Sequence, residues 1–192
     1  MFSVDFAEIE TLQQQGDWEK AGKILAEAAL AVERAGADFL LLATNTMHKV
    51  APAIEQAIRI PLLHIADATA EQLQKDGITR VGLLGTRFTM EQNFYKARLQ
   101  DKFGIEVIVP AEAERTTVHR IIFDELCQGE VNDDSRQRYL EVIDHLHEQG
   151  AQAVILGCTE IALLVEQSHT HVKLYDTTAL HASRAVARAL DS

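Results

Sequence analysis

The sequence predicts an α/β protein with parallel sheets, arranged as two pseudo-symmetric αβα lobes. The first observation behind this prediction is that short apolar runs alternate with longer amphipathic stretches along the chain. Such alternation is typical of a parallel sheet with helices on both faces. The second observation is that residues 36–46 align with residues 150–160 without a gap. An aligned pair of this kind favours duplication of one αβ unit over a chance likeness between αβ units, because the polar residues stand at the same offset in both copies.

Strands are expected at the apolar runs, and helices at the amphipathic stretches between them. The predicted strands are 39–43, 61–65, 80–85, 104–110, 153–157 and 172–176. The predicted helices are 17–35, 48–58, 68–76, 89–102, 112–128, 133–149, 160–166 and 178–190. Asp17 and Thr89 are expected to cap helix N-termini. Four glycines stand where a helix C-terminus favours positive φ: Gly36, Gly77, Gly104 and Gly150.

The composition indicates a globular protein with an acidic surface. Of its 192 residues, 47% are hydrophobic and 24% are charged, and the formal net charge is −11. This charge argues against nucleic acid and anionic membranes as partners, and no apolar run reaches the ~18 residues of a membrane span. The first residues, MFSVDFAEIE, do not resemble a signal peptide, and two cysteines fit a reducing compartment. We therefore expect a cytoplasmic protein.

Polar residues follow the two aligned strands at the same offset. They are Thr44-Asn45-Thr46 after the first strand and Cys158-Thr159-Glu160 after the second. Both sets stand at the carboxyl end of a strand, where open α/β sheets bind ligands. Hydroxyl groups and free backbone N–H groups at such a turn suit a carboxylate, although Thr and Asn there are also good helix caps.

Cys158 stands between a predicted strand and a predicted helix. The positive end of a helix dipole lowers the pKa of a thiol, so we expect Cys158 to form a thiolate, which acts as a base or a nucleophile. A buried, unreactive cysteine is the alternative interpretation, and position alone does not decide between them. Cys127 is expected near a helix C-terminus, where the dipole raises the thiol pKa, and is assigned a structural role.

Other motifs exclude several kinds of site. Residues 85–89 suit an anion but lack the Gly-Lys-Ser/Thr ending of a P-loop, and Arg87 within them is expected to face solvent. The chain has no GxGxxG fingerprint for a dinucleotide, and its eight histidines show no spacing typical of metal ligands. We therefore predict neither a cofactor nor a metal. His48 fits either the loop after the first aligned strand or a solvent-facing helical turn.

Three segments carry a resemblance to a known family: LLATNTMHK, LLGTRFTMEQNFYKARL and ILGCTEIALL. They resemble the signature segments of the aspartate/glutamate racemases, most of all the L-aspartate/glutamate-specific racemases, in which threonine replaces the first of two cysteines. The resemblance implies two flavodoxin-like αβα lobes with the active site in the cleft between them. It also implies a cofactor-independent reaction, a small amino-acid substrate and a homodimer.

The resemblance implies roles for individual residues. Thr44 and Cys158 take the two catalytic positions, and racemisation needs two such groups on opposite faces of the α-carbon. The matching substrate-binding residues are Gln13, Thr44, Asn45, Thr46, Thr159 and Glu160. Glu160 is expected to contact the α-ammonium group and Gln13 the side-chain carboxylate. The expected reaction is racemisation of L-aspartate or L-glutamate, with Cys158 as the main acid and base.

Two alternatives stay open from the sequence. The first is a related cofactor-independent isomerase of the hydantoin or arylmalonate type. The second is a vestigial, non-catalytic amino-acid-binding protein, because family members begin with one more βα unit, about 30 residues, that the first lobe here is expected to lack. The predicted lobes are residues 1–67 with 178–192, and residues 68–177. Thr44 and Cys158 are expected to work asymmetrically, because a threonine hydroxyl is a poor base.

Overall fold

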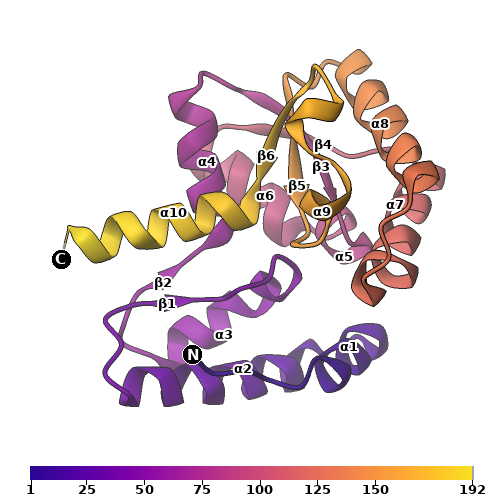
Figure 1. Cartoon of the computed structure of the whole chain (residues 1–192). Helices are drawn as coiled ribbons and strands as arrows, with labels where there is room; N and C mark the ends of the chain where they lie inside the picture. The colour runs from indigo at the N-terminus through magenta and orange to yellow at the C-terminus, as the bar shows by residue number, and fades with distance from the viewer. Residues whose placement is uncertain (192) are drawn as a thin grey trace. The chain divides into compact units, whose positions relative to one another are not determined.

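The computed structural model describes residues 1–191 and has an α/β fold with parallel strands throughout its sheets, which confirms the predicted fold class (Figure 1). Contacts divide the chain into two compact units. Met1–Leu42 and Met47–His64 form the N-terminal unit. Ala43–Thr46 and the chain from Ile65 onward form the larger unit.

The N-terminal unit is built on a two-stranded parallel sheet. Its elements are α1 (Phe6–Gln15), α2 (Trp18–Arg34), β1 (Leu40–Leu41), η1 (Thr46–Val50), α3 (Ala51–Ala57) and β2 (Leu62–Leu63). Ile9, Leu25 and Ile54 belong to its apolar core. Asp17 caps α2 as predicted, because its carboxylate accepts a hydrogen bond from the Lys20 backbone N–H at 3.0 Å. The sequence pattern did not predict α1.

The larger unit is built on a four-stranded parallel sheet in the order β4-β3-β5-β6. Its elements are α4 (Ile65–Lys75), β3 (Arg80–Gly85), α5 (Arg87–Glu91), α6 (Asn93–Phe103), β4 (Glu106–Ile108), α7 (Glu112–Asp124), η2 (Leu126–Gln128), α8 (Asp133–Glu148), β5 (Ala153–Gly157), α9 (Ile161–Leu164), η3 (Gln167–His169), β6 (Lys173–Asp176) and α10 (Thr177–Leu190). The chain passes from β3 to β4 on one side of β3 and then crosses to β5 on the other side. The direction in which strands are added to the sheet therefore reverses between β3 and β5.

Apolar side chains cover both faces of this four-stranded sheet. Successive residues of a strand point to opposite faces, so Leu83 and Ile155 pack in the core under α4 and α6. Leu84 and Val154 pack in the other core, under α7 and α8. Figure 1 shows α4 and α8 on opposite sides of the strands. The central strands β3 and β5 are buried on both faces, which explains why they are nearly continuous apolar runs in the sequence.

Several predicted helix boundaries are confirmed and others are wrong. The glycines predicted to end helices have positive φ: Gly36, Gly77, Gly104 and Gly150. The predicted helix 89–102 is two helices, α5 and α6, and they are separated at Gln92, which is extended. Thr89 lies inside α5, and Thr86 is the cap instead, because its hydroxyl accepts a hydrogen bond from the Thr89 backbone N–H at 3.3 Å.

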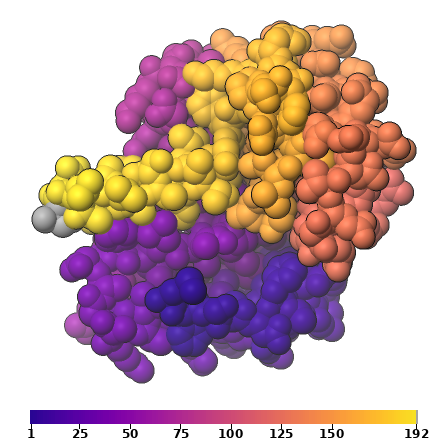
Figure 2. Space-filling model, viewed as in Figure 1, coloured from indigo at the N-terminus to yellow at the C-terminus, as the bar shows by residue number. Residues whose placement is uncertain are grey.

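The compact units differ from the predicted lobes in three places. The loop Ala43–Thr46, residues 65–67 and α10 all belong to the larger unit, in which α10 packs on α4, β5 and β6. The division of the chain into two racemase lobes stays a prediction. The last turns of α10 lie at the surface of the larger unit, where Val186 and Leu190 are exposed (Figure 2). Between residues 1 and 191, no helix combines the length and the apolar composition needed to cross a membrane.

Candidate active site

The carboxyl ends of β3, β5 and β6 bring polar side chains to one edge of the four-stranded sheet. Gly85 and Gly157 are paired at the ends of β3 and β5, and each is followed by a polar residue, Thr86 or Cys158. Thr177 follows the end of β6 in the same way. The crossover changes direction between β3 and β5, and ligands of open α/β sheets bind at such a switch point.

Glycine lets the ends of β3 and β5 approach closely. A Cβ atom on Gly157 would lie 2.7 Å from the carbonyl oxygen of Leu84, and one on Gly85 would lie 2.8 Å from the carbonyl oxygen of Gly157. Real Cβ atoms do not approach a backbone oxygen so closely. Each position therefore needs a residue without a side chain, and this close approach fixes the backbone that carries Thr86 and Cys158.

The predicted segment Thr44-Asn45-Thr46 reaches this same edge of the sheet. The Asn45 Nδ2 group donates a hydrogen bond to Thr177 Oγ1 at 3.0 Å, and the Thr177 hydroxyl donates to the carbonyl oxygen of Leu156 at 2.9 Å. Thr44 is half-buried on the same loop. Because Leu156 lies two positions before Cys158, these bonds connect the loop to the strand that carries the thiol.

Three threonine hydroxyls form a buried cluster beside this connection. Thr46 Oγ1 lies 3.0 Å from Thr86 Oγ1 and 3.3 Å from Thr89 Oγ1, and the latter two atoms are also 3.3 Å apart. All three side chains are buried. A hydroxyl both donates and accepts, so the cluster can reorient its protons when a ligand binds. The sequence predicts Thr46 as a site residue, whereas it places Thr86 and Thr89 only in the segment 85–89 that suits an anion, with Thr89 as a helix cap.

The Asn45 side chain has an unused acceptor. Only 3% of Asn45 is exposed, and its Oδ1 atom has no hydrogen-bond partner among residues 1–191. A buried polar atom without a partner costs about 1–3 kcal/mol, so such atoms call for an explanation. An N–H donor on a ligand, such as an ammonium group, would satisfy this oxygen.

Cys158, Thr159 and Glu160 form a compact group after β5. The Cys158 thiol donates a hydrogen bond to Glu160 Oε2 at 2.9 Å, and the Thr159 hydroxyl donates to the same oxygen at 2.6 Å. All three residues are half-buried. The carboxylate of Glu160 is therefore placed to accept the thiol proton.

The predicted low thiol pKa at Cys158 is wrong. Burial holds the pKa of this thiol well above its ordinary value, and the negative charge of Glu160 raises it further. The helix α9 has only four residues and begins three positions after Cys158. Its dipole is therefore a small effect beside burial and a carboxylate at hydrogen-bond distance.

Gln13 lies in the N-terminal unit, and its predicted contact with a substrate side chain stays a prediction. Its side chain is buried, and its Nε2 group donates to Met47 Sδ at 3.0 Å. His48 is buried in the same unit and does not face solvent, and its ring centroid is 4.3 Å from that of His64.

Three further expectations concern residues outside the strand-end cluster. Cys127 is an exposed cysteine on η2, and Arg87 is exposed as predicted. Within residues 1–191, no group of three His, Cys, Asp or Glu side chains is arranged to hold a metal ion.

Thr177 was missed by the sequence interpretation, although it follows β6 at the position that Cys158 takes after β5. This shared position is the signal that would have identified it.

Comparisons with known proteins agree on one family. The sequence model described as Asp/Glu/hydantoin racemase matches residues 2–185. The crystal structure of a proposed Asp/Glu racemase from Yersinia pestis is 54% identical in sequence, with a TM-score of 0.91 over 98% of this chain and 82% of that chain. An aspartate racemase homologue from Pyrococcus horikoshii OT3 is 35% identical, with a TM-score of 0.84 over 98% of this chain and 81% of that chain.

A relative found by sequence comparison also carries a racemase name. The broad-specificity amino-acid racemase of Bacillus subtilis is 25% identical over 174 residues, which are 88% of this chain and 73% of that protein. The family match includes every strand end described above, and the two structures each cover 98% of the chain. The chain therefore belongs to the Asp/Glu/hydantoin racemase family.

Proposed function

We propose that this protein racemises L-aspartate or L-glutamate without a cofactor, with Cys158 as the main acid and base. Membership of the racemase family supports amino-acid racemisation as the class of reaction. The observation that carries the proposal is the hydrogen bond from the Cys158 thiol to the Glu160 carboxylate at 2.9 Å. A proton donor and a proton acceptor in contact, at the edge of a sheet where ligands bind, suit an α-proton transfer.

The thiol has to lose its own proton before it accepts one from the substrate. In the proposed first step, the S–H bond of Cys158 breaks and the proton moves to Glu160 Oε2. The positive charge of the substrate α-ammonium group favours this step, because an opposite charge nearby lowers the pKa of a thiol. Substrate binding would thus oppose the effects of burial and of the Glu160 charge, which raise the thiol pKa in the structure.

In the second step, the thiolate of Cys158 takes the α-proton. The Cα–H bond breaks, an S–H bond forms, and the electron pair passes into the α-carboxylate, which becomes enediolate-like. Hydrogen-bond donors must stabilise this charge, and removal of one such donor in an enzyme costs about 2.7–4 kcal/mol of transition-state stabilisation. Asn45, Thr46 and Thr159 are the proposed donors.

Glu160 was expected from the family pattern to bind the α-ammonium group. Its contacts in the structure support a second role, because one of its oxygens already accepts from both Cys158 and Thr159. We propose that the charged Glu160 attracts the ammonium group as the substrate binds, and that it then accepts the thiol proton and becomes neutral. Asn45 Oδ1, which is buried without a partner, is then a further acceptor for the same group.

Thr44 is proposed to return a proton to the opposite face of the α-carbon. A threonine hydroxyl is a poor base, because its pKa lies far above neutrality, but it donates readily to a carbanion. We therefore propose that L-enantiomers lose their proton to Cys158 and that the O–H bond of Thr44, or of water bound to it, breaks as the new Cα–H bond forms. The resulting oxyanion takes a proton from solvent and Glu160 releases the thiol proton to solvent, which restores the starting protonation states.

Proton exchange in heavy water tests the proposed substrate class. Each candidate is incubated with the protein in 2H2O, and the loss of its α-proton signal is followed by NMR. The set includes L-aspartate, L-glutamate, a neutral L-amino acid, a 5-substituted hydantoin and an arylmalonate. We expect exchange with L-aspartate or L-glutamate well above that with the other compounds. Exchange of the hydantoin alone would identify a different isomerase of the same family, and binding of an amino acid without exchange would identify a non-catalytic protein.

A further inference from the structure

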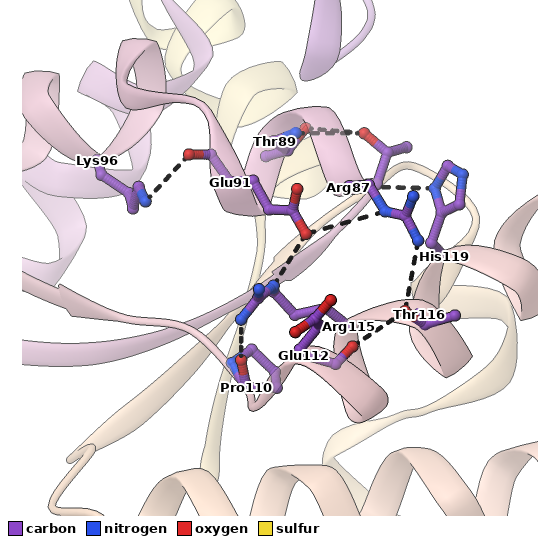
Figure 3. A network of polar contacts seen from close by, with 10 residues as sticks. Arg87, Thr89, Glu91, Lys96, Pro110, Glu112, Arg115, Thr116 and His119 are labelled. Atoms are coloured by element: carbon purple, nitrogen blue, oxygen red, sulfur yellow. Dashed lines mark hydrogen bonds and ion pairs between the residues drawn. The ribbon is translucent and has the colours of Figure 1, made fainter. Parts of the chain in front are cut away.

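The turn that joins β3 to α5 is held by a histidine of a different helix. The backbone N–H of Arg87, the first residue of α5, donates a hydrogen bond to His119 Nδ1 on α7 at 3.2 Å (Figure 3). The first N–H groups of a helix have no partner within the helix. His119 on α7 accepts a hydrogen bond from one of these groups, the N–H of Arg87. The hydroxyl of Thr86, the N-cap residue of α5, accepts from another, the N–H of Thr89.

This hydrogen bond defines the protonation state of His119. An Nδ1 atom that accepts a hydrogen bond carries no proton, so the ring is neutral and its proton is on Nε2. If Nδ1 were protonated, two N–H groups would face each other and the bond to Arg87 would be lost. The hydrogen bond between His119 and the turn therefore forms only while His119 is neutral.

The surroundings of His119 favour the neutral ring. Its centroid is 4.8 Å from that of Phe123 on α7 and 6.2 Å from that of Phe88 on α5. Burial lowers the pKa of His119, and the Arg87 charge lowers it further, whereas Asp124 on α7 and Glu91 on α5 act in the opposite direction.

Other polar contacts hold the Arg87 side chain beside the ring (Figure 3). Its guanidinium group donates to Thr116 Oγ1 at 3.3 Å and lies 3.8 Å from Glu91. Glu91 also accepts a hydrogen bond from Arg115 Nε at 3.0 Å. These contacts join α5 to α7, so the positive charge of Arg87 stays close to His119.

We propose that His119 is a positioning residue for the active site, acting through the turn Gly85-Thr86-Arg87. The bond from Arg87 fixes the backbone next to Thr86, whose hydroxyl lies 3.0 Å from that of Thr46. Thr46 is a proposed donor to the substrate carboxylate. Protonation of His119 at acidic pH releases the turn and weakens carboxylate binding. The effect on catalysis rests on the proposed function, whereas the hold on the turn does not.

Three variants separate the parts of this proposal. His119→Asn keeps an acceptor at the position of Nδ1 but cannot titrate near neutral pH. His119→Leu removes the acceptor and keeps an apolar side chain among the aromatic rings. Thr116→Val, one turn earlier on α7, removes a contact of the Arg87 guanidinium group and leaves the bond to the Arg87 backbone intact.

The first measurement is hydrogen exchange of the Arg87 backbone amide by NMR, which needs no activity. We expect its protection to fall about 10-fold in His119→Leu, as loss of one hydrogen bond suggests, and to stay near wild type in His119→Asn and Thr116→Val. In the wild type, the Arg87 amide shift should titrate together with the His119 ring, and in His119→Asn that transition should be absent. Unchanged protection in His119→Leu, or no transition in the wild type, would overturn the proposal.

The second measurement is the pH dependence of α-proton exchange. We expect KM to rise several-fold in His119→Leu with a smaller change in kcat, and the His119→Asn variant to restore KM and lose the acidic rise seen in the wild type. If KM is the same in all variants of an active enzyme, His119 does not position the site. If the wild type exchanges no amino acid, the proposed function fails, and the amide measurement still decides whether His119 holds the turn.

Discussion

Replacing Gly157 with alanine tests whether the close approach of β3 and β5 holds Cys158 in place. The new Cβ atom would lie 2.7 Å from the carbonyl oxygen of Leu84 and 3.0 Å from Leu83 Cδ1. The first of these is a backbone atom of the neighbouring strand, which cannot rotate away. The ends of β3 and β5 must therefore separate, and Cys158, the next residue along the chain, must move with them.

The expected loss of stability at Gly157 follows from two opposing effects. Overpacking a well-packed site destabilises by about 1–3 kcal/mol, while alanine in place of glycine restricts the unfolded chain and stabilises by about 0.4–1 kcal/mol. The net loss is up to about 2.6 kcal/mol. At about 2–4 °C per kcal/mol for a chain of this size, Tm falls by up to about 10 °C. A displacement of about 1 Å at a catalytic group lowers the rate by about 100-fold.

Gly82→Ala is the matched control for Gly157→Ala. Gly82 lies in the middle of β3, where a Cβ atom would lie 2.8 Å from Leu146 Cδ1, the mobile end of a side chain. Thermal unfolding by circular dichroism and α-proton exchange at 25 °C are measured for both variants. We expect both to lose stability, but only Gly157→Ala to lose most of its exchange per folded molecule. Wild-type exchange in Gly157→Ala, or an equal loss in Gly82→Ala, would refute the account of the strand ends.

Three further predictions concern proton transfer and pH. Glu160→Gln should lower the pKa of the Cys158 thiol, because the charge of Glu160 and its hydrogen bond raise that pKa. Alkylation of Cys158 at pH 7–8, monitored by mass spectrometry, should therefore be faster in the variant. The same variant should lose about 10²–10⁴-fold in α-proton exchange if Glu160 accepts the thiol proton; faster exchange would contradict that role. Thr44→Cys should supply a second thiol base and increase exchange of D-glutamate relative to L-glutamate, whereas an unchanged ratio would show that position 44 does not set the preference. Hydrogen bonds, the strongest from Lys173, lower the pKa of Asp76 to about 2, so Asp76 should stabilise the fold above pH 3.8 and lose this contribution as the pH falls towards 2. Asp76→Asn should flatten the dependence of the free energy of unfolding in urea on pH in that window, and an unchanged dependence would contradict the assignment.

The buried strands and many helix ends were predictable from local patterns. Strands covered on both faces are apolar almost throughout, so β3 and β5 are predicted at the residues where they occur. Caps such as Asp17 use residues close in sequence and are visible as short motifs. The break at Gln92 was not predictable, because neither glycine nor proline marks it. The helix α1 was missed although Ile9 and Leu12 have helical spacing.

The chemical state of the site depends on contacts that the linear sequence does not show. The hydrogen bond from Asn45 to Thr177 joins residues 132 positions apart, so it depends on the sheet having formed. The position of Cys158 at a strand end was correct, but its pKa was predicted from a helix dipole alone. The degree of burial and the side-chain direction of Glu160 decide that pKa, and both are properties of the folded chain.

The proposal that Cys158 is the acid and base of the reaction is tested most directly by α-proton exchange in 2H2O with the two cysteine variants side by side. Cys158→Ala removes the thiol next to Glu160, and Cys127→Ala removes the exposed thiol on η2. With L-aspartate or L-glutamate, we expect exchange at the wild-type rate in Cys127→Ala and a loss of about 10²–10⁴-fold in Cys158→Ala, with unchanged circular dichroism. Exchange by Cys158→Ala at close to the wild-type rate would contradict the account.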